Sequence, residues 1–254
     1  MPDERALSPV VARMWGREPV SRRGPRPRLD MAAVVAAAIE IADTDGLAAV
    51  SMGGVAAKVG VATMALYRYV GSKDELLTVM SDSAVPPPPE RGELAWRAYL
   101  AAWTRANRDF LLRRPWMLSI NLFTPPLGPH RLRWLDRALD ALGDTALDAG
   151  EKINAASALT GYALSDATLT YALSAGRDGL GGGAERMAEA GAGGAADYGA
   201  MLAEVLDPAD YPALAAVVRD GAFGGGEGWV ADEDFLFGLN LLLDGIEVLN
   251  VRRA

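Results

Sequence analysis

A run of seven residues, Thr63-Met64-Ala65-Leu66-Tyr67-Arg68-Tyr69, concentrates side chains that could bind a nucleic acid. Four of them share one side of a helix, because residues three or four positions apart lie on one face: Thr63, Met64, Tyr67 and Arg68. Leu66 lies on the other side and can be buried. A short helix with a polar exposed side fits the major groove of DNA, which is about 12 Å wide. The run therefore predicts a recognition helix.

Two further features concern contacts to phosphate. Tyr67 and Tyr69 are two positions apart, so on a helix they point roughly 160° away from each other. Both cannot lie in one core, although core packing remains the alternative for either one. Lys73 stands at the first helical position after Ser72, where the helix dipole disfavours a cation. A phosphate would remove this conflict; the alternative is an exposed lysine tolerated at small cost.

Aromatic side chains are also concentrated between residues 103 and 134. A small-molecule site needs a cavity with a few polar groups inside apolar walls. The candidates are Trp103, Phe110, Trp116, Met117, Asn121, Phe123 and Trp134, with Tyr162 and Asp166 able to face them. Core packing is the alternative for each aromatic residue taken singly.

Two charged or titratable residues near this cluster need partners. Asp166 is a carboxylate on an apolar helix face, which requires a compensating group. That group is either a cationic or hydroxylated ligand or one of Arg131 and Arg133. His130 stands among three prolines and is expected to be a satisfied loop or helix-cap histidine.

The composition excludes several kinds of site. The chain has no cysteine and one histidine, which excludes thiolate metal sites, histidine clusters and cysteine nucleophiles. The glycine-rich stretch 179–194 lacks the flanking strand and helix that a phosphate-binding loop requires. We therefore expect no catalytic residue, no metal and no cofactor, and an enzyme is the less favoured hypothesis.

The sequence also predicts a cytoplasmic protein without membrane contact. No apolar run reaches the roughly 20 residues of a membrane span. The N-terminus lacks the continuous apolar core of a secretory signal.

The net charge of −8 is unevenly distributed. Residues 1–80 carry ten Arg or Lys and nine Asp or Glu, whereas the remaining residues carry fifteen and twenty-four. Four arginines precede the first expected helix: Arg22, Arg23, Arg26 and Arg28. A chain with an acidic body and a locally basic tip can approach a polyanion tip first.

The elements that position the recognition helix are themselves helices. Helix starts are expected at Asp30, Ser51 and Ser72, the last in a capping box with Glu75. Gly46 is expected to end the first helix in the left-handed αL conformation. These signals predict a helix-turn-helix head at residues 28–85. Residues 1–27, rich in Pro, Arg and Gly, are expected to be a disordered arm.

A run of four prolines, residues 86–89, is expected to be an extended spacer before a larger helical body at residues 90–254. Residues 176–194 are expected to be a loop. Helical patterns cover 91–113, 115–123, 129–142, 150–175, 195–206, 209–219 and 231–251. The predicted fold class is all-α, with a three-helix head and a body that binds a ligand and dimerises.

Two helices of the body carry seams suited to packing against another helix. The last helix places apolar residues at spacings of four and three: Phe235, Leu239, Leu242, Ile246 and Leu249. The helix near 150–175 carries small ones: Ala156, Thr160, Ala163, Ala167 and Thr170. A four-helix bundle across a two-fold axis would use both seams. A purely intramolecular core is the alternative.

The segments Gly60–Val70 (GVATMALYRYV) and Ser72–Leu77 (SKDELL) resemble the signature of the TetR-family transcriptional regulators. The resemblance covers residues 30–80. It implies phosphate contacts from Ser51, Tyr67, Tyr69 and Lys73, base-edge contacts from Thr63, Met64 and Arg68, and an arm around Arg26 and Arg28 in the minor groove. It further implies a homodimeric repressor on a palindromic operator of double-stranded DNA, controlled by a small-molecule effector in the body.

Three positions depart from the family pattern. Family members usually have a serine where Ala62 stands, and commonly have basic residues where Gly53 and Gly54 stand. Adjacent glycines weaken a helix by about 1 kcal/mol each relative to alanine. The alternative function is therefore a helical interaction protein with a weakened DNA-binding head.

Overall fold

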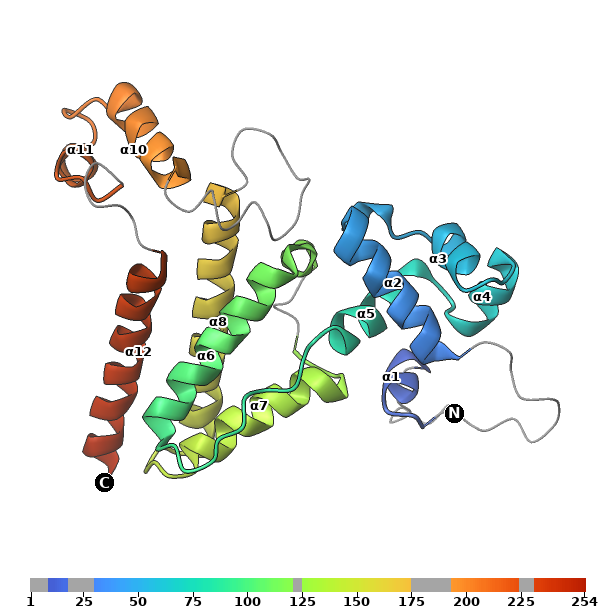
Figure 1. Cartoon of the computed structure of the whole chain (residues 1–254). Coiled ribbons are helices and arrows are strands. Elements are labelled where there is room, and N and C mark those ends of the chain that lie inside the picture. The colour runs from blue at the N-terminus through green and yellow to red at the C-terminus, as the bar shows by residue number, and fades with distance from the viewer. Residues whose placement is uncertain (1–8, 18–29, 121–124, 175–192, 224–230) are drawn as a thin grey trace, which may run out of the picture. The chain divides into compact units, whose positions relative to one another are not determined.

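The computed structural model describes residues 9–17, 30–120, 125–174, 193–223 and 231–254, which form helices and turns without a strand (Figure 1). The predicted all-α fold is confirmed for these residues. They divide into two compact units: unit 1 is Met1–Glu90 with Trp116–Asp140, and unit 2 is Arg91–Pro115 with Ala141–Ala254. Residues 116–140, expected in the body, thus cluster with the head.

Unit 1 is built around the helices of the head. These are α1 (Pro9–Met14), α2 (Met31–Asp45), the 3-10 helix η1 (Leu47–Ala49), α3 (Met52–Lys58), α4 (Thr63–Tyr69) and α5 (Lys73–Ser83). Fully buried apolar side chains form the core: Val34, Ala38, Val50, Val55, Ala56, Leu66, Val70, Leu76 and Met80. Unit 1 also contains most of the 3-10 helix η2 (Pro115–Ser119) and of α7 (Pro129–Leu142).

Two helix predictions for unit 1 are wrong. The disordered arm was expected to cover residues 1–27, but α1 forms at Pro9–Met14 and packs on α5 with Val11 buried. The helix expected at 115–123 is a 3-10 helix over Pro115–Ser119. In both places the apolar residues that decide the structure find partners far away in the sequence, which a local pattern does not reveal.

The predicted helix caps are confirmed at all three starts. Asp30 accepts the N–H of Ala32 at 3.2 Å, Ser51 Oγ accepts that of Gly54 at 3.1 Å, and Ser72 Oγ accepts that of Glu75 at 3.1 Å. The capping box differs in its second half, because the Glu75 carboxylate accepts the N–H of Gly71 at 2.9 Å. The start of α5 is therefore held together by side chains as well as by its own helix.

Glycines with positive φ lie just after α2 and just after α3, where the chain turns. Gly46 has φ +82° and ψ 166°, so its positive φ suits glycine, but the predicted αL conformation is wrong in ψ. Gly60 has φ +73° between α3 and α4. A side chain at either position would be strained, since L residues rarely adopt positive φ.

Unit 2 contains the long helices α6 (Trp96–Arg113), α8 (Ala149–Ser174) and α12 (Ala231–Arg253), together with α10 (Gly193–Val205) and α11 (Pro212–Arg219). Helix α8 packs against both α6 and α12, and α10 packs against α8 and α11 (Figure 1). The largest fully buried side chains are Tyr99, Leu100, Trp103, Leu142, Leu159, Phe235, Leu239 and Leu243. No helix among the described residues is both long and apolar enough to span a bilayer.

The two predicted seams are mostly buried inside the single chain. Phe235, Leu239 and Ile246 on α12 are buried, and so are four seam residues of α8: Ala156, Ala163, Ala167 and Thr170. Leu249 and Thr160 are exposed. The assignment of these seams to a bundle between two copies is thus wrong for their buried members, because α6, α8 and α12 pack on one another with them.

Candidate nucleic-acid interface

Helix α4 separates a buried side from an exposed side as the sequence predicted. Leu66 is completely buried and Val70, directly after the helix, is buried as well. Met64 is 70% exposed and Tyr67 is 43% exposed, while Tyr69 is half-buried. Thr63 and Arg68 are also exposed. Because α3 packs against α4 and supplies buried Val55 and Ala56, the exposed side chains of α4 are held on a braced helix.

The start of α4 has no side-chain cap. Ala62 has φ −69° and ψ 142°, the conformation of an N-cap, and its carbonyl accepts the N–H of Ala65 at 2.8 Å. No side chain among the described residues accepts a hydrogen bond from the first turn. The departure from the family pattern at Ala62 therefore leaves the first N–H groups of α4 without a side-chain acceptor.

The cations of this surface fall into two groups. Lys58 on α3 forms an ion pair with Glu40 on α2 at 2.8 Å, so its charge is partly neutralised. Arg68 and Lys73 are exposed, and neither pairs with a carboxylate in the described part of the chain. Lys73 begins α5 beside the capping residue Ser72. Two unneutralised cations thus flank the exposed side of α4.

The remaining predicted DNA contacts are a serine and two arginines. Ser51 is exposed at the start of α3, where its hydroxyl caps the helix and can still reach solvent. Arg26 and Arg28 lie outside the described residues. The structure therefore places seven of the nine predicted residues on one unit: Ser51, Thr63, Met64, Tyr67, Arg68, Tyr69 and Lys73.

The predicted ligand-binding residues are distributed over both units. Trp103, Phe110, Tyr162 and Asp166 belong to unit 2, whereas Trp116 and Trp134 belong to unit 1. Trp103 and Phe110 are buried in the core of unit 2. Asn121 and Phe123 lie outside the described residues.

The two candidate tryptophans in unit 1, Trp116 and Trp134, have partners that explain their burial. Trp116 Nε1 donates to Asp43 Oδ1 at 2.6 Å, and Trp134 Nε1 donates to the carbonyl of Pro86 at 2.6 Å. His130 lies in the first turn of α7, and its Nδ1 is 2.9 Å from Asp82 Oδ2, so the predicted position at a helix start is confirmed and one ring nitrogen has a partner.

Asp166 pairs with Arg108 of α6, whereas the sequence analysis left open a ligand, Arg131 or Arg133 as its partner. The Arg108 side chain is 4% exposed, contacts Asp232 Oδ1 at 2.9 Å and lies 4.8 Å from the centre of the Phe235 ring. Burial raises the pKa of the Asp166 carboxyl, and the hydrogen bond from Arg108 opposes that rise. Sequence reasoning missed Arg108. Its signal was a cation four residues after Thr104 on the apolar face of a helix.

Tyr162 is joined to the start of α12. Its hydroxyl donates to the carbonyl of Phe235 at 2.8 Å, and the two rings stack with centres 5.4 Å apart. Burial, followed by the negative charge of Asp166, raises the pKa of the Tyr162 hydroxyl. A group of polar side chains therefore lies between α6, α8 and α12, with each charge compensated.

Comparison with known proteins identifies both parts of the chain. Residues 34–80 match the model described as bacterial regulatory proteins, tetR family, and residues 88–250 match the tetracyclin repressor-like C-terminal domain. The chain belongs to the TetR family. It is 36% identical over 248 residues to the HTH-type transcriptional repressor DrrR1 of Streptomyces coeruleorubidus, covering 94% of this chain and 85% of that protein.

Two solved structures illustrate the shared TetR fold. ActR of Streptomyces coelicolor, in complex with actinorhodin, is 23% identical with a TM-score of 0.67, covering 89% of this chain and 98% of ActR. BioQ, in complex with its double-stranded DNA operator, is 25% identical with a TM-score of 0.52, covering 57% of this chain and 89% of BioQ. The protein is thus a DNA-binding transcriptional regulator of the TetR family.

Proposed function

We propose that this protein is a homodimeric repressor that binds a palindromic operator through α4 and is controlled by a small-molecule effector. The observation that carries the proposal is the exposed face of α4 with Met64 and Tyr67, next to Arg68 and Lys73, which pair with no described carboxylate. The similarity to the repressor DrrR1 over 94% of the chain supports repression as the direction of control.

In the proposed complex the side chains of unit 1 have different tasks. Thr63, Met64 and Arg68 read base edges in the major groove, which gives sequence preference. Ser51, Tyr67, Tyr69 and Lys73 contact phosphates, which gives affinity without sequence preference. Arg26 and Arg28 are proposed to extend into the minor groove. BioQ was solved with its DNA operator, which supports this use of the fold.

A homodimer is proposed from a second, exposed face of α12. Four apolar side chains at helical spacing lie there with 49 to 70% of their surface exposed: Phe237, Leu241, Val248 and Val251. Ile153 and Leu169 on the neighbouring helix α8 are also exposed. Burying such a face against its equivalent removes apolar surface from water, which is the main favourable term in association. Two recognition helices would then reach successive major grooves roughly 34–36 Å apart.

The dimer proposal has a direct test. Phe237→Glu and Leu241→Glu should convert the protein to a monomer in light scattering after size exclusion. Val217→Glu on α11, a similarly exposed apolar position, is the matched control and should leave the mass unchanged. A dimer that persists in both α12 variants would refute the use of this face.

The effector is proposed to bind in unit 2 among α6, α8 and α12, where Trp103, Phe110, Tyr162 and Asp166 lie. ActR, which has the same fold, was solved with actinorhodin, so the fold can hold a small molecule. The proposed site does not include the other candidates, because Trp116 and Trp134 belong to unit 1 and Asn121 and Phe123 lie outside the described residues. An effector can shift DNA binding only by its different affinity for the two conformations.

The decisive experiment measures operator binding by fluorescence anisotropy against salt, with DNA from upstream of the protein's own gene. Affinity should fall steeply with salt, since phosphate contacts release counterions. Lys73→Ala should lower the salt slope by about one per protomer. Lys58→Ala, which removes a cation already paired with Glu40, should change the slope less.

Two further measurements test the base-reading residues and the alternative function. Changes at Thr63 or Met64 should alter the preferred sequence, which a selection from random DNA measures. A loss of affinity without any change in preference would count against the assignment of α4 to the groove. Absence of salt-sensitive binding at any effector concentration would favour the helical interaction protein with a weakened head.

The same proposal has consequences for catalysis and for the location of the protein in the cell. We expect no catalytic function, because the proposed contacts are binding contacts. A regulator that contacts the operator works where the bacterial DNA is, in the cytoplasm.

A further inference from the structure

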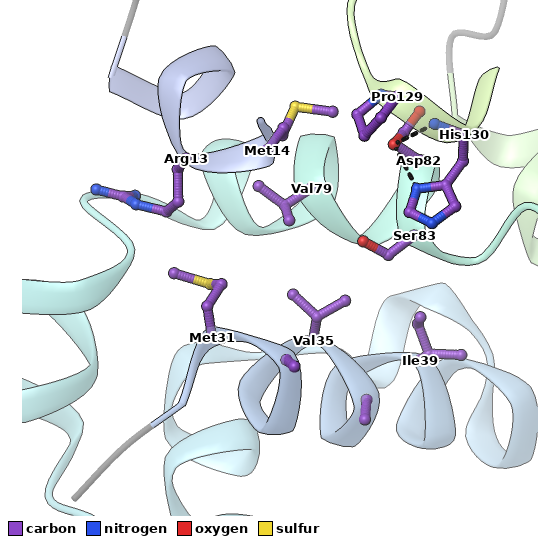
Figure 2. A pocket seen from close by; sticks show the side chains of 12 residues that line it. Arg13, Met14, Met31, Val35, Ile39, Val79, Asp82, Ser83, Pro129 and His130 are labelled. Carbon is purple, nitrogen blue, oxygen red and sulfur yellow. Dashed lines mark hydrogen bonds and ion pairs between the residues drawn. The ribbon is translucent and has the colours of Figure 1, made fainter. Parts of the chain in front are cut away.

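Unit 1 contains a cavity of about 310 Å³ that neither DNA binding nor the proposed effector site uses. It lies between α1, α2, α5 and the start of α7, all within unit 1 (Figure 2). Met31, Val35 and Ile39 line it from α2, and Met14 and Val79 line it from the opposite side (Figure 2). Its walls are therefore mainly apolar.

One end of the cavity is polar and precisely organised by a buried carboxylate. The Asp82 side chain is 4% exposed and accepts the N–H of His130 at 3.2 Å and that of Arg131 at 3.0 Å. The same carboxylate lies 2.9 Å from His130 Nδ1. These three contacts cap α7 and fix the imidazole ring at the edge of the cavity (Figure 2).

The fixed ring leaves a defined hydrogen-bonding group for a ligand. With Nδ1 facing a carboxylate, the neutral imidazole carries its proton on Nδ1 and presents Nε2 as an acceptor. Within the described residues, Nε2 makes no hydrogen bond, and neither does the hydroxyl of Ser83 beside it. A ligand hydroxyl at this end would donate to Nε2.

The electric charge of the lining restricts the ligand further. Asp82 places a carboxylate in the wall, which opposes an anionic ligand. The guanidinium of Arg13, at the other end, is engaged by Glu75 at 3.2 Å and so offers little compensation. Thioether side chains such as those of Met14 and Met31 make favourable contacts with aromatic rings.

The chain approaches two lining residues of the cavity closely at Gly128, the residue before Pro129. A Cβ at Gly128 would lie 2.2 Å from Asp82 Cγ and 2.3 Å from Met14 Cε. Glycine at this position lets the chain pass close to Asp82 while Met14 remains in the wall. The helix that carries Met14, α1, also lies outside both family-model matches, which cover 34–80 and 88–250. One wall of the site is thus supplied by an element additional to the matched domains.

We propose that this cavity is a second small-molecule site, in the head, for a neutral aromatic compound of about two fused rings that carries one hydroxyl group. Cavities of roughly 300–1,000 Å³ with few polar groups are typical of ligand sites, and this one is at the small end of that range. The proposal concerns binding in unit 1 and does not require that the protein bind an operator or an effector in unit 2.

The test uses the full-length protein labelled with ¹³C at the methionine methyl groups, with 2-naphthol as the probe. Methyl spectra should show saturable shifts of Met14 and Met31, assigned by Met14→Leu and Met31→Leu. Met201, on α10 of unit 2, is an internal control. Its methyl signal should not follow the saturation curve of the Met14 and Met31 signals as the probe concentration rises. Unshifted Met14 and Met31 signals at the highest soluble probe concentration would overturn the proposal.

A matched pair of variants tests whether the cavity itself is the site. Ala36→Phe fills it from an exposed alanine of α2 that lines the cavity, so it should abolish the shifts. Ala33→Phe adds the same bulk at an exposed alanine of α2 that does not line the cavity and should retain binding. Equal binding by both variants would refute the site. The methyl signals of Met52 and Met80, both buried in the core, verify folding of each variant.

A comparison of three probes tests whether the ligand needs a hydroxyl group. Naphthalene lacks the donor and should bind about threefold to tenfold more weakly, the usual net effect of one hydrogen bond. That difference should disappear in His130→Phe, where Nε2 is absent. The anion 2-naphthoate should bind more weakly than 2-naphthol; tighter binding of the anion would contradict the assigned ligand class.

Discussion

Arg13 on α1 lies 3.2 Å from the carboxylate of Glu75 on α5, an ion pair between residues 62 positions apart. The same carboxylate accepts the N–H of Gly71 at the start of α5. The two side chains are 15% and 28% exposed, so water screens the pair only in part. Helix α1 is thereby fastened to the turn that precedes Lys73.

The first prediction concerns this link. Arg13→Ala should reduce the free energy of unfolding of the head by about 0.5–1 kcal/mol, the value of a partly exposed ion pair. Glu75→Ala should cost more, about 1–2 kcal/mol, because it also removes the acceptor of Gly71. Urea denaturation of both single variants and the double variant measures the coupling. Strictly additive effects would mean that the pair contributes nothing.

The second prediction concerns the adjacent glycines of α3. Gly53→Ala should stabilise the head by about 0.5–1 kcal/mol, because alanine restricts the unfolded chain and its Cβ meets nothing within 4 Å. Gly54→Ala should gain less or destabilise, since its Cβ would lie 3.1 Å from the capping Ser51 Oγ. Thermal melts of both variants provide the comparison. An equal gain from the two changes would show that the cap tolerates the added methyl group.

Local signals in the sequence were sufficient for most of the helices. The caps Asp30, Ser51 and Ser72 act through atoms within three residues, so the sequence contains everything that defines those starts. The sidedness of α4 followed for the same reason, since helical periodicity alone separates Leu66 from Met64 and Tyr67.

Contacts between distant residues could not be predicted in this way. Arg108 meets Asp166 across 58 positions, and Trp116 meets Asp43 across 73. No periodicity encodes such pairs, because they depend on which helix faces cross in the folded chain. The buried seams of α8 and α12 show the same limit: the spacing indicated helix packing correctly, but it could not distinguish a partner in the same chain from one in a second copy.

The third prediction concerns Gly238, where α12 approaches Tyr162. A Cβ at this position would lie 2.3 Å from Tyr162 Oη, so Gly238→Ala must displace the tyrosine. The displacement removes the hydrogen bond to the Phe235 carbonyl and the stacked ring contact, and it should cost about 1–3 kcal/mol.

Gly245, on the same helix, provides the control for that change. Its added Cβ would meet nothing within 4 Å, so Gly245→Ala should stabilise α12 by about 0.5–1 kcal/mol. Opposite shifts of the urea midpoint are expected for the two variants. If Gly238→Ala were also stabilising, Tyr162 would not be held where the structure places it.

The last prediction concerns the acid dependence of stability at the start of α8. Asp148 and Glu151 form a reciprocal capping box, with N–H to carboxylate distances of 2.9 and 2.8 Å, and Arg253 Nη2 lies 2.6 Å from Glu151 Oε1. The N–H of Asp148, followed by the Arg253 side chain, lowers the pKa of the Glu151 carboxyl below its ordinary value of 4.5.

Because the folded state holds this proton less tightly than the unfolded state, the stabilisation is complete above pH 4.5 and is lost as the pH falls through the lower, folded pKa. Glu151→Gln should therefore reduce the urea midpoint at pH 7 and approach the parent protein at acid pH. Glu93→Gln, an exposed site without a partner among the described residues, should match the parent throughout. A constant difference between Glu151→Gln and the parent from pH 7 to below 4 would show that the carboxylate charge is not what stabilises the cap.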